Sequence, residues 1–106
     1  MKLKILSSAT QDLIQGFKFY EKQAKGIGNY FLETLYAEID SLTETAGIHP
    51  IYFKTYHRLL SKRFPFVVYY QIDNNVTYIY AVLDCRKNPA LTRQKLGGKS
   101  PKNKRK

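Results

Sequence analysis

The stretch from Lys62 to Pro89 constrains the fold of this 106-residue chain more than any other. It holds two runs dense in aromatic and β-branched residues, which favour strands, and the pair Asn74 and Asn75 separates them. Asparagine tolerates the positive φ angles that a tight hairpin turn requires. The sequence therefore predicts a β-hairpin across this stretch.

Both faces of the predicted hairpin are apolar. On the first run Phe66, Val68 and Tyr70 share one face, while Val67 and Tyr69 share the other. On the returning run, successive side chains alternate between the faces. One face carries Thr77, Ile79, Ala81 and Leu83, and the other carries Val76, Tyr78, Tyr80 and Val82. Strands that are apolar on both sides lie in the middle of a sheet, and we expect the first half of the chain to supply their cover.

The first half of the chain carries two helical patterns. Apolar residues recur at helical spacing from about Ala9 to Lys25 and again from about Asn29 to Ala46, with a short glycine-containing break between them. Ser8, with Gln11 three positions later, has the spacing of a capping box at the start of the first helix. Because the break is short, we expect an antiparallel helical hairpin that packs its apolar stripe on the sheet.

Two further strands complete the predicted fold. A short apolar run from Leu3 to Leu6 predicts one at the start, and Tyr56 to Leu60 predicts another before the hairpin. The expected class is α+β, in the order β-α-α-β-β-β, with the helical hairpin on a small, mainly antiparallel sheet. We expect a single domain over residues 1–96. Residues 97–106 contain glycine, proline and charge but no apolar residue, which predicts a disordered basic tail.

The chain is strongly basic, with 18 Lys and Arg against 8 Asp and Glu. Five of the basic residues lie in the last ten positions, so 13 basic and 8 acidic residues remain elsewhere and give a charge of about +5. This balance favours an acidic or polyanionic partner, such as RNA, DNA or a negatively charged protein. The alternative is that the basic surface only keeps a small protein in solution.

Composition also narrows the class of protein. A single cysteine, Cys85, excludes an intramolecular disulfide and a zinc site built on cysteines, and we expect its side chain to be a buried small hydrophobe. The first residues contain too short an apolar run for a signal peptide, and no stretch approaches the length that spans a membrane. We therefore expect a cytoplasmic protein.

The familiar catalytic and ligand-binding motifs are absent from the sequence. The glycines lack the pattern of a phosphate-binding loop, and no serine or cysteine has a recognisable triad partner. The two histidines, His49 and His57, have no acidic residue at ligand spacing. We expect neither a metal nor a cofactor.

Cationic side chains do recur around the last three predicted strands. They are Lys54, His57, Arg58, Lys62, Arg63, Arg86 and Lys87. Neighbouring strands lie about 4.8 Å apart, so these residues can gather at strand ends and contact the phosphates of a target. The alternative is that these cations only keep the strand ends hydrated and pair with acidic residues such as Asp73 and Asp84.

Cleavage of RNA through its own 2′-hydroxyl needs proton transfer and a cation that stabilises the charged phosphorane. Arg58, Arg63 and Arg86 are the candidates for the cation. His57 is the candidate for proton transfer, because an imidazole titrates near neutral pH.

At these residues the chain resembles the RelE/ParE superfamily of bacterial toxins. The resemblance lies in the order β-α-α-β-β-β, in Tyr56-His57-Arg58, in Arg63-Phe64-Pro65-Phe66 before the third strand, and in the stretch from Ala81 to Pro89. It extends from about Leu3 to Leu91 and is closest to the ParE-like, plasmid-stabilisation branch.

The resemblance implies the toxin of a type II toxin–antitoxin pair, held inactive by a cognate antitoxin. Members of the ParE branch inhibit DNA gyrase by protein contact, and members of the RelE branch cut mRNA on the ribosome. The arginine that the ribonucleases often carry inside the third strand aligns here with Val67, and neither Tyr nor His follows Arg86. These departures favour a gyrase inhibitor over the alternative, a ribosome-dependent endoribonuclease.

Three apolar side chains on the second predicted helix fall outside its main stripe. They are Tyr30, Leu32 and Tyr36, and we expect them to line a groove for the antitoxin. The alternative is that all three are structural.

Overall fold

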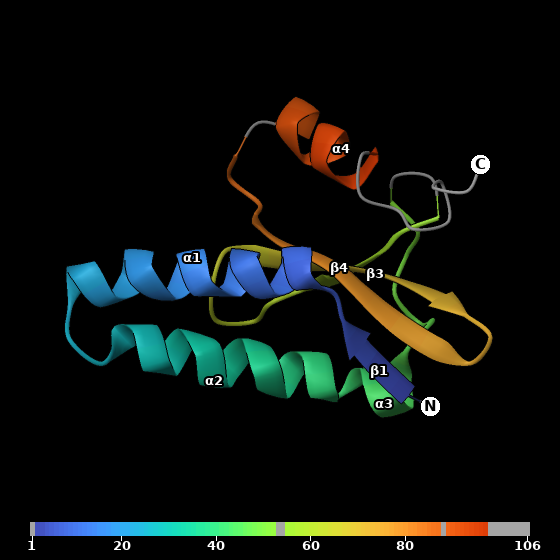
Figure 1. The fold of residues 1–106 in the computed structure, drawn as a ribbon, viewed down its shortest axis with the longest axis horizontal. Helices are drawn as coiled ribbons and strands as arrows, with labels where there is room; N and C mark the ends of the chain where they lie inside the picture. Colours follow the sequence, from blue (N-terminus) through green and yellow to red (C-terminus); the bar gives the residue numbers. More distant parts are fainter. Residues whose placement is uncertain (1, 53–54, 88, 98–106) are drawn as a thin grey trace.

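The computed structural model describes residues 2–52, 55–87 and 89–97, and its order of elements confirms the predicted one (Figure 1). Two short helices, α3 and α4, are added to the predicted order. The elements are β1 (Lys2–Ile5), α1 (Ser7–Gln23), α2 (Ile27–Asp40), α3 (Leu42–Thr45), β2 (His57–Leu60), β3 (Phe66–Asp73), β4 (Val76–Asp84) and α4 (Pro89–Gly97).

The strands β3 and β4 lie at the centre of the sheet, as predicted. The strand order is β1-β4-β3-β2, in which β1 is parallel to β4 and the other two pairs are antiparallel. Asn74 and Asn75 form the hairpin turn with φ angles of 50° and 65°. These left-handed conformations cost asparagine less than most other side chains, which explains the residue choice at the turn.

A β-bulge in β4 breaks the predicted alternation of its side chains. Ile79 and Ala81 pair with consecutive residues of β3, so Tyr80 is the extra residue of the bulge. As a result Ile79 and Val82 pack on one face of the sheet, while Tyr80 and Ala81 pack on the other. The predicted common face of Ile79, Ala81 and Leu83 is therefore wrong after the bulge.

The helices α1 and α2 form the predicted antiparallel hairpin and cover one face of the sheet (Figure 1). Buried side chains from both helices meet those of the central strands in a single core. This core contains Ala9, Leu13, Phe31, Leu35 and Ile39 from the helices and Phe66, Val68, Tyr70, Ile79 and Val82 from the strands. Each large side chain buried in this way contributes about 1.5–3 kcal/mol to the stability of the fold.

A carboxylate of α1 fastens the turn between the two helices. Glu21 accepts hydrogen bonds from the backbone N–H groups of Gly26, at 3.0 Å, and of Gly28, at 2.9 Å. Gly26 adopts a φ of 92°, a backbone conformation that would be strained for a residue with a side chain. The break that the glycines mark in the sequence is therefore a tight turn with its amide groups satisfied.

The second face of the sheet is covered by a different part of the chain than expected. Val67, Tyr69 and Tyr80 pack there with Tyr56 from the loop before β2 and Leu96 from α4. The hydroxyl of Tyr56 donates a hydrogen bond to the backbone carbonyl of Leu96 at 2.9 Å. The expectation that the first half of the chain covers both faces is wrong for this face, because α4 carries too weak an apolar pattern to be recognised in the sequence.

Several local expectations also differ from the structure. The side chain of Ser8 does not cap α1 but donates to the carbonyl of Tyr80 at 2.8 Å, which links the helix to the bulge. The second predicted helix is divided, since α2 ends at Asp40 and α3 follows it. Cys85 is exposed rather than buried, because it lies in the turn after β4. Helix α4 extends to Gly97, where the predicted tail begins, and residues 98–106 lie outside the described residues.

Candidate functional site

Neighbouring residues of β2 carry two of the candidate side chains to opposite faces of the sheet. His57 pairs in register with Tyr70, whose side chain lies in the core under the helical hairpin, and Arg58 pairs with Tyr69 on the other face. Successive side chains of a strand point in opposite directions, so His57 and Arg58 diverge. The structure does not bring the candidate proton donor and this candidate cation together.

Arg58 lies among aromatic rings on the face that α4 covers. Its guanidinium carbon is 4.6 Å from the centre of the Tyr52 ring and 6.0 Å from that of Tyr69, which are distances for cation–π contacts. Burial raises the pKa of Tyr69, and a hydrogen bond with Arg58 opposes that rise. Among the residues that the structure describes, the buried Nε atom of Arg58 has no hydrogen-bond partner. Sequence reasoning missed both tyrosines, although Tyr69 alternates with Tyr70 in the predicted strand.

Arg86 is held by the carboxylate that ends β4. Its Nη2 atom lies 2.8 Å from Oδ2 of Asp84, and its Nε donates to Oδ1 of Asp84 at 3.0 Å. The side-chain hydrogen bond from Arg86 lowers the pKa of Asp84 despite some burial. The side chain of Arg86 remains 60% exposed, so a target can still contact it.

Three more candidate cations lie at the same end of the sheet as Arg86. Lys62 and Arg63 are exposed in the turn between β2 and β3, and Lys87 is exposed after β4. The backbone of Cys85 donates to the carbonyl of Pro65 at 2.9 Å, which joins the two segments. The topology therefore places these four residues at the same end of the sheet. Lys54 lies outside the described residues.

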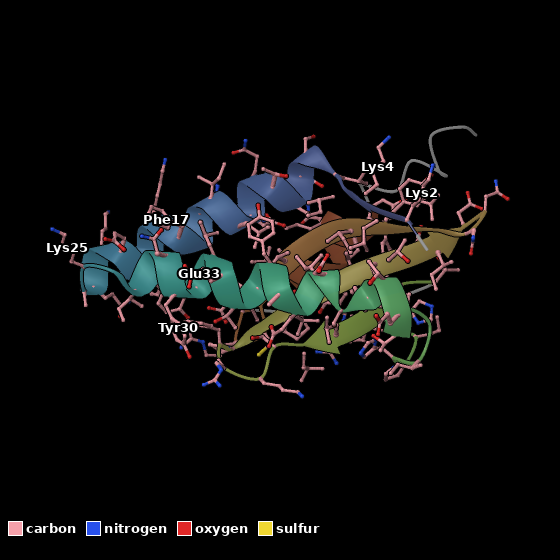
Figure 2. All side chains as sticks on the ribbon, turned by 90° about the horizontal axis from the view of Figure 1, so that it is seen from below. Lys2, Lys4, Phe17, Lys25, Tyr30 and Glu33 are labelled. Carbon is pink, nitrogen blue, oxygen red and sulfur yellow. The ribbon has the colours of Figure 1, made fainter. Side chains whose placement is uncertain are left out.

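The candidate antitoxin surface lies on α2. Tyr30 is 43% exposed and Tyr36 is 41% exposed, whereas Leu32 is partly buried against the core. The ring of Tyr30 also lies 5.4 Å from that of Phe64 in the turn before β3. Figure 2 shows Tyr30 on the side of α2 that faces away from α1. The two tyrosines are accessible to a partner, and Leu32 serves the core.

A cleft between α1 and the end of β4 was not expected from the sequence. Its volume is about 220 Å³, and Asp12, Phe19, Phe66 and Lys87 are among its lining residues. Asp12 is only 9% exposed, and an aspartate is rarely buried to this extent unless it is paired. Among the described residues, no three histidine, cysteine or acidic side chains group closely enough to hold a metal ion. No helix of the described ranges is long and apolar enough to span a membrane.

The protein resembles a known protein in its structure. The scan against family models and the search of curated proteins found no match. The structure search matched a chain of the "Chromosomal ParDE TA system from P. aeruginosa" with a TM-score of 0.72 and 17% sequence identity. The match covers 77% of this chain and 92% of that one.

The architecture is thus a helical hairpin on one face of a four-stranded mixed sheet. Since most of the matched chain superposes on it, the protein has the ParE-like fold that the sequence predicts.

Proposed function

We propose that this protein is the toxin of a type II toxin–antitoxin pair, that a cognate antitoxin neutralises it in the cytoplasm, and that it inhibits DNA gyrase by protein contact. The observation that carries the proposal is the structural likeness to a chain of a ParDE system over 92% of that chain. Two features of the candidate site add support for action by contact.

The first feature is the separation of the groups that catalysis would need. RNA cleavage requires a proton-transfer group and a cation on the same reacting phosphate. His57 and Arg58 occupy opposite faces of the sheet, and Nδ1 of His57 is engaged with the carbonyl of His49 at 2.7 Å. This arrangement favours a surface that binds over a centre that catalyses.

The second feature is the exposed basic end of the sheet. Lys62, Arg63, Arg86 and Lys87 are all exposed there, and a protein with acidic patches is an electrostatically suitable target. In this proposal the antitoxin uses a different part of the molecule, the exposed face of α2 that carries Tyr30 and Tyr36. An acidic amphipathic segment suits that surface, because its apolar side chains can cover the two rings while its carboxylates reach Lys62 and Arg63 in the turn that contacts Tyr30 through Phe64.

The competing candidate is a ribosome-dependent mRNA endoribonuclease. The observation in its favour is the same exposed group of cations, which could also hold RNA phosphates. The two candidates predict different cellular lesions, so one experiment separates them.

The experiment is inducible expression in a bacterium, followed by mapping of transcript ends and by a measurement of plasmid supercoiling. We expect growth arrest with relaxed plasmids and intact transcripts. Cleavage of ribosome-bound transcripts that disappears in Arg86→Ala would instead support the ribonuclease. Normal growth under confirmed expression of folded protein would contradict the toxin proposal itself.

A further inference from the structure

Residues 47–52, here called the strap, lie along the outer edge of β2. The backbone N–H of Arg58 donates to the carbonyl of Pro50 at 3.1 Å, and Ile51 forms an isolated antiparallel bridge with His57. The strap therefore pairs with the start of β2 and shields its edge. Exposed strand edges are ready sites for pairing with another chain, so the state of the strap decides whether that edge is available.

On the face beneath the helices, the strap is tied to the hydroxyl of Tyr70. This residue is fully buried, and its oxygen accepts the backbone N–H of Gly47 at 3.1 Å and lies 2.6 Å from Nδ1 of His49. Burial raises the pKa of Tyr70, and hydrogen bonds from the backbone amides of Gly47 and His49 oppose that rise. With the amide of Gly47 donating to this oxygen, we assign the hydroxyl proton of Tyr70 to the hydrogen bond with Nδ1 of His49. His49 is therefore neutral in this arrangement, with its own proton on Nε2.

His57 makes a second hydrogen bond to the strap, in which its ring nitrogen is the donor. Its Nδ1 lies 2.7 Å from the carbonyl oxygen of His49, and because a carbonyl only accepts, Nδ1 must donate. The ring of His57 also stacks on that of Tyr70, with centres 4.9 Å apart. Protonation of His49 would remove the acceptor that the hydroxyl of Tyr70 needs.

On the other face, the strap covers a cation. Tyr52 stacks over the guanidinium of Arg58 and packs against Tyr69, with ring centres 5.8 Å apart. While the strap is closed, the buried Nε of Arg58 has no hydrogen-bond partner within the described part of the chain. Movement of the strap would thus uncover a guanidinium together with a strand edge.

We propose that the strap is a cover released by acid, in which protonation of His49 breaks its bond with Tyr70, detaches residues 47–52 from β2 and exposes Arg58. A protonated Nδ1 cannot accept a hydrogen bond, so the buried hydroxyl of Tyr70 loses its acceptor, at an unfavourable free energy. The open strap instead lets water solvate both groups.

The direction of the pH dependence follows from the surroundings of His49. Burial first, and then the charge of His57 on β2, lower the pKa of His49 from its ordinary value of 6.5. The remaining titratable group that faces it is Tyr70 on β3, and no carboxylate of the described residues contributes to that pKa. The closed strap therefore binds fewer protons than the open one, so its stability is complete above pH 6.5 and declines as the pH falls below that value. This inference does not depend on the toxin proposal.

Amide hydrogen exchange measured by NMR on the whole protein tests the strap directly. The reporter is the amide of Arg58, which donates to Pro50 of the strap. The matched control is the amide of Ser61, just after β2, which donates to the carbonyl of Phe66 at the start of β3 at 2.9 Å. After correction for intrinsic rates, we expect the protection of Arg58 to stay nearly constant above about pH 6.5 and to fall as the pH is lowered from there. The fall should approach tenfold for each pKa unit that separates the open and closed states, while Ser61 keeps its protection.

The variant His49→Gln gives the second arm of the test. A glutamine oxygen can accept the hydroxyl proton of Tyr70 but does not titrate, so the protection of Arg58 should become independent of pH. Tyr70→Phe removes the tie altogether and should lower the protection of Arg58 already at neutral pH, with Ser61 reporting whether the sheet stays folded. Constant protection of Arg58 in the unsubstituted protein, a parallel loss at Ser61, or a persistent pH dependence in His49→Gln would each overturn the proposal.

Discussion

The carboxylate of Asp12 on α1 accepts the backbone N–H of Val82 on β4 at 3.0 Å, although the two residues lie far apart in the sequence. Asp12 is 9% exposed, and its other oxygen lies 3.9 Å from Nζ of Lys95 on α4. One buried carboxylate thus joins the helical hairpin, the strand after the bulge and the last helix. Buried polar groups of this kind are expensive to leave without partners.

Substitution of Asp12 should therefore destabilise the fold. Asp12→Ala removes the acceptor of the Val82 amide, and a buried donor left in this state costs about 1–3 kcal/mol. Urea denaturation followed by circular dichroism measures the loss. Glu33→Ala is a suitable control, because Glu33 is an exposed carboxylate of α2 (Figure 2). Equal stability of the two variants would contradict this role of Asp12.

Gly16 allows α1 and α2 to approach each other closely. A Cβ atom at Gly16 would lie 2.5 Å from two carbon atoms of the Phe31 ring, which is too close without a shift of the ring. Gly16→Ala should cost about 1–3 kcal/mol of stability, as overpacking of a core typically does. In a double-mutant cycle Phe31→Leu should relieve part of that cost, and strictly additive effects would show that the two residues do not interact.

The turn between β3 and β4 should discriminate between side chains at position 75. Asn75 has a φ of 65°, which favours glycine or asparagine over alanine. We expect Asn75→Ala to lower the free energy of unfolding by about 1–2 kcal/mol and Asn75→Gly to leave it nearly unchanged. Thermal denaturation of both variants provides the comparison. A glycine variant as unstable as the alanine variant would indicate that the asparagine side chain matters for another reason.

The pair formed by Asp84 and Arg86 should make a pH-dependent contribution to stability. Because Arg86 lowers the pKa of Asp84, this contribution is present above the ordinary value of 3.8 and is lost as the pH falls through the lower folded value. In Arg86→Ala the pKa of Asp84 should return toward 3.8, and acid unfolding should begin at a slightly higher pH. Titration of the Asp84 carboxyl by NMR measures the first effect. An unchanged pKa, with Arg93→Ala on α4 as the control, would mean that the ion pair does not persist in solution.

The sequence predicted those parts of the fold that short-range patterns encode. Runs of aromatic and β-branched residues and the Asn74-Asn75 pair predicted the central hairpin, and helical spacing predicted α1 and α2. The bulge at Tyr80 could not be predicted, because an extra residue in a strand leaves no mark on composition. Helix α4 was also missed, since only Thr92 and Leu96 of its residues are buried and its apolar pattern is weak.

The candidate site was predicted less completely than the fold. The exposed cations at the end of the sheet follow from strand order and chain direction, which the sequence indicates. The opposite orientation of His57 and Arg58 depends on alternation within a strand of only four residues, from His57 to Leu60. The strap and the bonds of Asp12 depend on contacts between segments far apart in the sequence, which local patterns do not contain.

A gyrase supercoiling assay with the purified protein tests the proposed function most directly. The account predicts that the protein inhibits supercoiling, that Lys62→Glu combined with Arg63→Glu weakens the inhibition, and that ribosome-bound mRNA stays intact in a parallel reaction. Uninhibited supercoiling together with cleavage of that mRNA would contradict it.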